Sequence, residues 1–214
     1  MHSKHTLDQQ GARYQVDVLI IGSGLAGLFA ALQLVAYQPH LTIALISKEQ
    51  LEEGNSRYAQ GGIAAAIGVE DSFEQHIRDT HLAGDGLCYV PTVEHIIRQG
   101  PKVLQDLIRY GVNFSKNAQG EYALGQEGGH AIRRILHQGD ATGLEVISAL
   151  VAQLKAHPRI TCHEYHIAVN LIVTHTPHQP DHQGEVLGAY VLAVKTGLVH
   201  TFLANQVILA TGGA

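Results

Sequence analysis

The chain has little that would indicate a disulfide framework, a membrane span or a nucleic-acid surface. Only two cysteines, Cys88 and Cys162, occur in 214 residues, far apart and outside any CxxC pair, which favours reduced thiols. The apolar runs fall short of the ~20 residues that a membrane-spanning helix needs. The formal net charge of −5 gives no electrostatic case for nucleic-acid binding.

The N-terminal residues also lack the apolar core of a signal peptide. We therefore expect a cytoplasmic protein with a flexible tail over residues 1–13. Histidine is abundant, with fifteen copies, and His175, His178 and His182 gather in a polar loop over residues 175–184. No ligand pattern of cysteines or carboxylates surrounds them, so we interpret them as solvated loop residues and expect no metal site.

A glycine motif near the start is the first positive indication of function. Residues 16–22 form a nearly continuous apolar run, typical of a parallel strand buried on both faces. A G-x-G-x-x-G motif at residues 22–27 follows it, and a helix is predicted over 25–37 and a second strand over 41–47. In such a βαβ unit the glycines allow a tight turn, close approach to a pyrophosphate and close packing of the helix on the sheet.

The end of the second predicted strand departs from the usual dinucleotide pattern. An Asp or Glu normally holds a ribose there, whereas this chain has Ser47 and Lys48. Ser47 can hydrogen-bond a ribose hydroxyl. For Lys48, contact with a phosphate or the adenosine and a solvated surface position are two open alternatives.

The rest of the chain is predicted to alternate helices and strands around an irregular segment at 112–140. Helices are expected from a Ser72–Gln75 capping box to Ala83, over 92–110 with a break near Gly100-Pro101 and Gly111 as its C′ residue, and from Thr142 to about His157. Strands are expected over 160–173, 186–196, 198–204 and 207–210. The fold class is therefore α/β: a Rossmann-like fold with a mainly parallel sheet and a small antiparallel meander.

Several motifs are more specific than a general nucleotide-binding fold. They are Asn-Ser-Arg-Tyr-Ala-Gln-Gly-Gly-Ile-Ala at 55–64, Glu-Gly-Gly-His at 127–130 followed by Arg-Arg-Ile-Leu-His at 133–137, Asp-Ala-Thr-Gly at 140–143 and Ala-Thr-Gly-Gly at 210–213. In this order they resemble the fumarate reductase/succinate dehydrogenase flavoprotein family and, within it, the L-aspartate oxidase branch. The resemblance covers residues 16–214 and implies that residues 14–214 form the N-terminal part of an FAD-binding domain.

The resemblance implies an extended FAD with its pyrophosphate on the first glycine loop and its isoalloxazine beside residues 59–62. The backbone of Ile167 and Ala168 is implied to meet the adenine, and Thr211 and Gly212 to approach the cofactor at the end of the last strand. The other implied FAD contacts are Gly22, Ser23, Gly24, Leu25, Ala26, Gly27, Ser47, Lys48, Asn55, Ser56, Arg57, Tyr58, Ala59, Gln60, Gly61 and Gly62. Membrane-associated members carry a flavin-bonding histidine at the position of Asn55, so the resemblance implies non-covalent FAD.

The resemblance also implies a substrate site at Gln126, Glu127 and His130. Glu127 is implied to orient the substrate through its amino group, and Gln126 stands where family members often have Arg. From spacing alone, Glu127 and His130 would be interpreted as loop residues. For Arg133 and Arg134, binding of a substrate carboxylate and a surface position are both open.

Asp140 and Thr142 are interpreted as structural supports of this loop. Thr142 with Glu145 forms the pattern of a capping box at a helix start, and such a cap contributes about 1 kcal/mol.

The activity implied for the intact protein is oxidation of L-aspartate to iminoaspartate, with hydride transfer to FAD and with O2 or fumarate as acceptor. The implied pathway is NAD biosynthesis, with quinolinate synthase downstream. Catalytic residues, including an arginine, are expected beyond Ala214, so we expect no activity from the 214-residue chain alone. Two alternatives stay open: a soluble fumarate reductase-like oxidoreductase, and a non-catalytic nucleotide-binding module.

Overall fold

In the computed structural model, which describes residues 11–174 and 184–213, the chain divides into two compact units. The first unit combines the chain up to Gly54 with the chain from Val151 on, and the second unit spans residues 55–150. The tail residues 1–10, Ala214 and the loop histidines His175, His178 and His182 lie outside the described residues.

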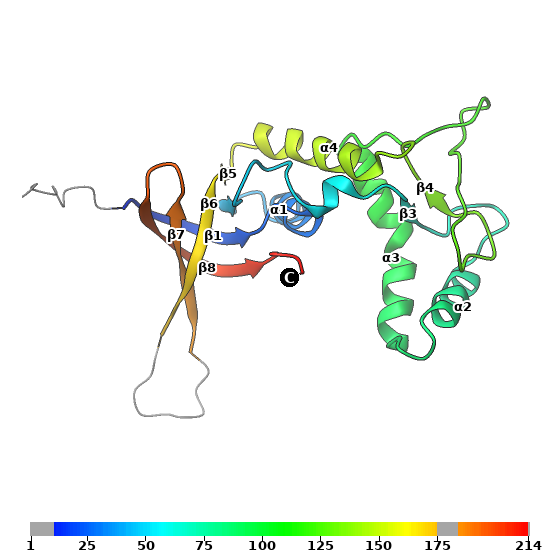
Figure 1. The fold of residues 1–214 in the computed structure, drawn as a ribbon, viewed down its shortest axis with the longest axis horizontal. Coiled ribbons are helices and arrows are strands. Elements are labelled where there is room, and N and C mark those ends of the chain that lie inside the picture. Colours follow the sequence, from blue (N-terminus) through cyan, green and yellow to red (C-terminus); the bar gives the residue numbers. More distant parts are fainter. Residues whose placement is uncertain (1–10, 175–183, 214) are drawn as a thin grey trace, which may run out of the picture. The chain divides into compact units, whose positions relative to one another are not determined.

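The first unit is built on one six-stranded sheet of order β5-β2-β1-β8-β7-β6 (Figure 1). Its elements are β1 (Arg13–Ile21), α1 (Leu25–Tyr37), β2 (Ile43–Ile46), β5 (Ile160–His163), β6 (His166–Val173), β7 (Val186–Ala193) and β8 (Leu198–Leu209). Strands β5, β2, β1 and β8 run parallel, whereas β7 pairs antiparallel with both β8 and β6. This confirms the predicted α/β fold with a mainly parallel sheet and an antiparallel meander.

The core of the first unit explains the apolar run in β1. Leu19 and Ile21 pack in one buried cluster with Ala189 and Val191 of β7 and Phe202 of β8. Helix α1 also buries one face, including Leu28, Leu32 and Val35. Because successive side chains of a strand point to opposite faces, a strand with packing on both sides has apolar residues at every position.

Two strand predictions are wrong in their connections. The expected strand over 160–173 is two strands, because Glu164 and Tyr165 separate β5 from β6. Tyr165 has a φ of 57°, and β5 and β6 lie at the two ends of the sheet order. The segments expected at 198–204 and 207–210 form the single strand β8. Strand β7 pairs with its residues 198–203, and β1 pairs with its residues 201–209.

The second unit contains helices and one small antiparallel sheet. Its elements are the 3-10 helix η1 (Asn55–Tyr58), β3 (Ile63–Ala64), α2 (Phe73–Ala83), α3 (Val90–Arg109), β4 (Ile135–Leu136) and the first part of α4 (Thr142–Ala156). Strands β3 and β4 pair antiparallel. The segment 112–140 is otherwise mostly irregular, as predicted.

Helix α2 starts at the predicted cap, but only half of the capping box forms. The backbone N–H of Gln75 donates to the Ser72 hydroxyl at 3.1 Å. The Gln75 side chain turns to Asp79 instead, at 2.8 Å, and the Ser72 N–H donates to the Asp71 carboxylate. The Asp71 carboxylate therefore accepts the hydrogen bond from the Ser72 N–H that the Gln75 side chain was expected to accept.

Helix α3 continues through Pro101 without the predicted break. A proline inside a helix removes one hydrogen bond and is unfavourable, but Ile97, Leu104 and Leu107 are buried on both sides of it. This shared apolar face holds the two halves as one helix. Although α3 has 20 residues, no helix within the described part of the chain is long and apolar enough to cross a membrane.

The predicted glycine stop of α3 is confirmed. Gly111 has a φ of 99°, and its N–H donates to Ile108 O at 2.9 Å, while the Val112 N–H donates to Leu107 O at 3.1 Å. This pair of bonds is a Schellman motif, which closes a helix with a left-handed residue.

We expect Pro101→Ala to raise the free energy of unfolding by about 1–3 kcal/mol, because alanine restores a helix donor and has a far better helix propensity. Gln99→Ala is the matched control on an exposed position of α3 and should change stability by less than about 0.5 kcal/mol. Urea denaturation followed by circular dichroism measures both. Equal stability of Pro101→Ala and the unmodified chain would show that Pro101 does not strain α3.

Candidate cofactor and substrate site

The predicted cofactor residues of the first unit gather at the carboxyl ends of its parallel strands. The glycine loop at 22–27 follows β1, Ser47 follows β2 and Thr211 follows β8. Since β2, β1 and β8 are parallel neighbours, these three segments lie at the same edge of the sheet. Ligands of open α/β sheets bind at this edge.

Close backbone packing explains two of the motif glycines. Gly22 has a φ of 118°, and a Cβ on it would overlap the carbonyl oxygen of Ala210. A Cβ on Gly27 would overlap the carbonyl oxygen of Gly22. The strand therefore turns sharply at Gly22, and α1 packs directly on that turn, as a dinucleotide fingerprint requires.

The N-terminus of α1 begins at the glycine loop without a side-chain cap. Its N-cap is Gly24, and the first turn holds no acidic residue. Leu25 and Ala26 are exposed. The backbone N–H groups of a first helical turn and the positive end of the helix dipole attract phosphate, so the glycine loop and the start of α1 fit the pyrophosphate of a dinucleotide.

Ser47 ties the glycine loop to the end of β2. Its hydroxyl lies 2.8 Å from that of Ser23, and both residues are buried. Lys48 is exposed immediately beyond. The structure thus places a neutral hydroxyl pair where a ribose-binding carboxylate normally lies, with a cation next to it.

The remaining predicted contacts of the first unit lie on β6 and after β8. Ile167 and Ala168 belong to β6, an end strand of the sheet order, and pair with Leu192 and Val191 of β7 on one side. One row of backbone groups on an end strand lies outside the ladder, which suits recognition of a base by backbone. Thr211 and Gly212 are exposed after β8.

A pocket beside the Ser47 segment was not predicted from the sequence. Lys155, His163, Tyr165 and Lys195 are among its lining residues. The Lys195 ammonium lies 3.9 Å from the centre of the Tyr165 ring. Burial lowers the pKa of His163 to about 4, so this imidazole is neutral at physiological pH and contributes no positive charge to the pocket.

In the second unit, the start of α4 holds the segment expected to border the isoalloxazine. The Gly143 N–H donates to Ala59 O at 2.8 Å, and a Cβ on Gly143 would overlap the Ser56 carbonyl oxygen. The Thr142 hydroxyl donates to Gln60 O at 3.4 Å. The Asp-x-Thr-Gly motif therefore positions residues 56–60 through close backbone packing.

The interpretation of Thr142 and Glu145 as a capping box is wrong. The Thr142 hydroxyl accepts from Gln138 N at 3.0 Å, and the Glu145 carboxylate accepts from Asn113 N at 2.8 Å. Gln138 lies just before the helix, whereas Asn113 is 32 positions from Glu145, a contact that a local pattern cannot reveal. The bonds of Thr142 to Gln138 and Gln60 agree with its interpretation as a structural support.

The structure brings Glu127 next to the glycines of the flavin segment. Its Oε1 atom lies 2.6 Å from the position that a Cβ of Gly61 would take. The His130 N–H donates to Glu127 O at 3.2 Å, and Gly129 has a φ of 87°, the conformation required at the third position of a type II turn. The Gln126 amide donates to His130 O at 2.7 Å, so Gln126 closes the turn.

Arg134 is the most unexpected residue of the site region. It is fully buried, with both Asp71 oxygens within 3.0 Å of its Nε and Nη2 atoms and Asp79 Oδ2 2.9 Å from its Nη1 atom. Arg134 is therefore neither a surface charge nor open to a substrate carboxylate, whereas Arg133 is exposed. Sequence reasoning missed Asp71 and Asp79 because both lie more than fifty positions from Arg134.

A model of the FAD binding domain family matches residues 17–214. The chain belongs to this family.

Its relatives include L-aspartate oxidases and a fumarate reductase. It is 44% identical over 200 residues to L-aspartate oxidase 1 of Ralstonia nicotianae, covering 92% of this chain and 37% of that protein. It is 45% identical to an L-aspartate oxidase of Yersinia pestis, covering 96% of this chain and 39% of that protein. A solved structure of quinol fumarate reductase FrdA from E. coli matches with a TM-score of 0.87 and 31% identity, over 95% of this chain and 33% of that one.

These likenesses confirm the resemblance inferred from the motifs. The chain is a homologue of L-aspartate oxidases within the fumarate reductase/succinate dehydrogenase flavoproteins. It spans well under half the length of the relatives that it matches.

Two adjacent glycines of the flavin segment should respond differently to alanine. Gly62 has a φ of 133°, and a Cβ on it would overlap the Leu136 carbonyl oxygen, so Gly62→Ala should cost about 1–3 kcal/mol of stability. Gly61 faces only the mobile end of the Glu127 side chain, so Gly61→Ala should cost less than about 1 kcal/mol. Urea denaturation measures both, and equal losses would contradict this packing.

Proposed function

We propose that this chain supplies the FAD-binding part of an L-aspartate oxidase that converts L-aspartate to iminoaspartate. In the proposed reaction a hydride leaves the α-carbon and the amino nitrogen loses a proton, and O2 or fumarate finally receives the two electrons. The identity of 44–45% to L-aspartate oxidases over most of the chain supports this assignment. The product would feed quinolinate synthase in NAD biosynthesis.

The described residues fit FAD held without a covalent bond. In the first unit, the glycine-capped start of α1 and the close-packed Gly22 and Gly27 suit the pyrophosphate, while the Ser23–Ser47 hydroxyl pair and Lys48 suit the adenosine side. When bound, FAD supplies the hydride acceptor. Asn55 has no ring nitrogen with which to form a flavin bond.

The position of Glu127 is the observation that carries the substrate assignment. Its carboxylate lies against Gly61, within the segment expected to border the isoalloxazine. A carboxylate attracts the ammonium group of aspartate, which succinate lacks, so Glu127 would favour aspartate over succinate at this position.

The two alternatives account for fewer of these features. A fumarate reductase-like enzyme would act on a substrate without an amino group, so the Glu127 carboxylate would have no ammonium group to bind. A nucleotide-binding module would not need the close packing of residues 56–62 on α4 and β4. The proposal extends to a longer protein in which further chain completes the substrate pocket, as the length of the relatives suggests.

The first test of the proposal is Glu127→Gln in the full-length protein. Loss of a charge-assisted bond worth about 1.5–3 kcal/mol should raise the KM for aspartate roughly 10- to 100-fold, and Glu127→Asp should have a smaller effect. Steady-state hydrogen peroxide release measures this. The control is Glu121→Gln, since Glu121 is an exposed carboxylate bonded to Asn117. An unchanged KM in Glu127→Gln would remove Glu127 from the substrate site.

Precipitation with acid should release the flavin. Because Asn55 cannot bond the isoalloxazine, trichloroacetic acid should leave FAD in the supernatant and a colourless protein pellet, as absorbance of each fraction will show. A yellow pellet, or a fluorescent band on a denaturing gel, would mean that another residue holds the flavin covalently.

A further inference from the structure

A group of three buried charges in the second unit lies next to the turn at residues 127–130, called here the Glu127 turn. Arg134 and the Asp71 side chain have no solvent exposure, and the Asp79 side chain is 7% exposed. Removing ions from water costs several kcal/mol each, and apolar replacements of such groups are often as stable or more so. Stability alone is therefore a weak reason for this cluster.

The Asp79 carboxylate connects the cluster to the end of the turn. One oxygen accepts from the Ala131 N–H at 2.9 Å, and the other accepts from the Gln75 side chain at 2.8 Å. Burial would raise the pKa of Asp79, but these two bonds and the Arg134 charge together hold the pKa below its usual value. The carboxylate is thus ionised at neutral pH and is a fixed acceptor for the turn.

The other end of the turn is fixed by the backbone around Arg134. The Arg134 N–H donates to Gly125 O at 3.0 Å, and the Gly125 N–H donates to Ile135 O at 2.8 Å. The backbone of Arg134 therefore anchors the first end of the turn, at Gly125. The side chain of Arg134 holds Asp79, which in turn anchors the last end of the turn, at Ala131. Glu127 lies between the two anchors.

Helix α2 provides the surface on which the turn rests. A Cβ on Gly129 would lie 3.5 Å from the Ala83 side chain, and the His76 and His130 rings meet edge to face with centroids 6.0 Å apart. Asp79 lies on the same helix, between His76 and Ala83. The position of the turn is therefore set by α2 rather than by the turn sequence alone.

We propose that Asp79 is a positioning residue for Glu127. Arg134, which is paired with Asp71, holds the Asp79 carboxylate in place. The Asp79 carboxylate binds the Ala131 amide and so keeps the Glu127 carboxylate against Gly61. This rests on the proposed function only in taking Glu127 as the group that binds the substrate. Asp79 itself makes no contact with the substrate in this scheme.

The test compares Asp79→Leu, which removes the acceptor, with Asp79→Asn, which retains an oxygen without the charge. In the full-length protein, Asp79→Leu should raise the KM for aspartate about tenfold with a smaller change in kcat, since displacement of a binding group by a fraction of an ångström is costly. Hydrogen exchange at the Ala131 amide should rise by about the same factor. Asp79→Asn should show smaller changes of about threefold in both measurements, because a neutral acceptor binds roughly half as strongly.

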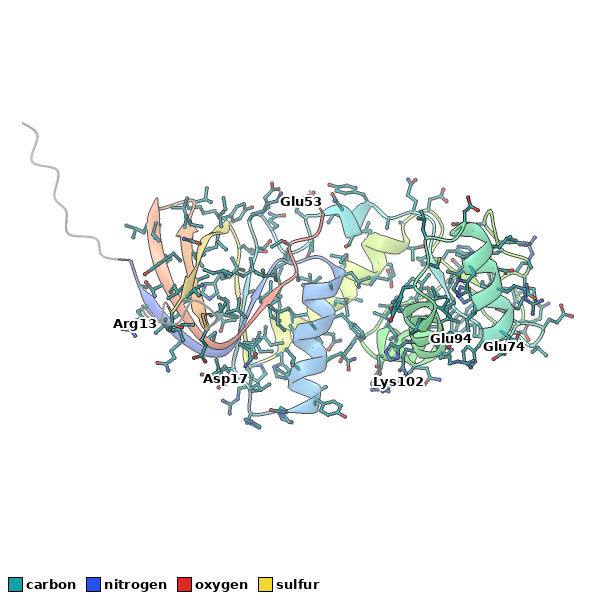
Figure 2. The ribbon with its side chains drawn as sticks, turned by 90° about the horizontal axis from the view of Figure 1, so that it is seen from below. Arg13, Asp17, Glu53, Glu74, Glu94 and Lys102 are labelled. Carbon is teal, nitrogen blue, oxygen red and sulfur yellow. The ribbon has the colours of Figure 1, made fainter. Side chains whose placement is uncertain are left out.

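The matched control is Glu74→Leu. Glu74 is an exposed carboxylate on the same helix that pairs with Arg98 at 3.0 Å, and it is labelled in Figure 2. It has no bond to the turn among those described, so KM and exchange at Ala131 should be unchanged. A rise in either would show that any loss of charge on α2 disturbs the site.

A double-mutant cycle separates positioning from general support. If Asp79 acts through Glu127, Asp79→Leu should not raise KM further in the Glu127→Gln background, because the group it positions is gone. An equal rise in the KM for aspartate in both backgrounds would overturn the proposal. Unchanged hydrogen exchange at the Ala131 amide in Asp79→Leu would overturn it too. If Asp79→Leu does not fold, the cycle is run with Asp79→Asn, whose effect should be about threefold because a neutral acceptor binds roughly half as strongly.

The exchange measurement also distinguishes this proposal from the proposed function. If aspartate is not the substrate, neither the unmodified protein nor Glu127→Gln turns it over, yet exchange at Ala131 still reports whether Asp79 holds the turn. If aspartate is the substrate and exchange is unaffected by Asp79→Leu, only the positioning role fails.

Discussion

Close backbone contact at glycine is the constraint on which both units depend. At four motif glycines a single Cβ would overlap a neighbouring carbonyl oxygen: Gly22, Gly27, Gly62 and Gly143. In the first unit this contact brings α1 onto the turn after β1, so that the helix begins at the carboxyl edge of the parallel strands. In the second unit it packs the Ser56–Gln60 segment on α4, where Gly143 donates to Ala59. In each unit, close backbone packing at glycine therefore fixes a segment that we propose to contact the cofactor.

The fold was predictable where local patterns decide it and not where distant contacts do. Helix α1 has the predicted bounds because a glycine motif precedes it and Pro39 follows it closely. Helix α3 passes Pro101 because one apolar face packs on both sides, and propensity is overridden by such packing. The division between β5 and β6 lacks a glycine or proline, and a left-handed Tyr165 makes the turn instead.

The residues of the candidate site likewise fall into those that sequence motifs reveal and those that only distant contacts bring together. The glycine loop, Ser47, the segment 55–62 and Glu127 were all recognisable from motifs, and the structure explains their spacing through strand ends, close packing and the turn at Gly129. The Asp71–Arg134–Asp79 cluster was not recognisable, because Arg134 is 63 positions from Asp71 and 55 positions from Asp79. Buried charges are identified by exposure and distance, and neither can be inferred from a run of residues.

The central claim is that Glu127 and the FAD-binding residues serve the oxidation of an amino acid. Its most direct test is the visible absorption spectrum of the full-length protein during anaerobic addition of L-aspartate, with succinate as the comparison. The account predicts that aspartate bleaches the flavin band and that succinate does not. A flavin band that aspartate leaves unchanged and succinate bleaches would contradict it and support a fumarate reductase-like activity instead.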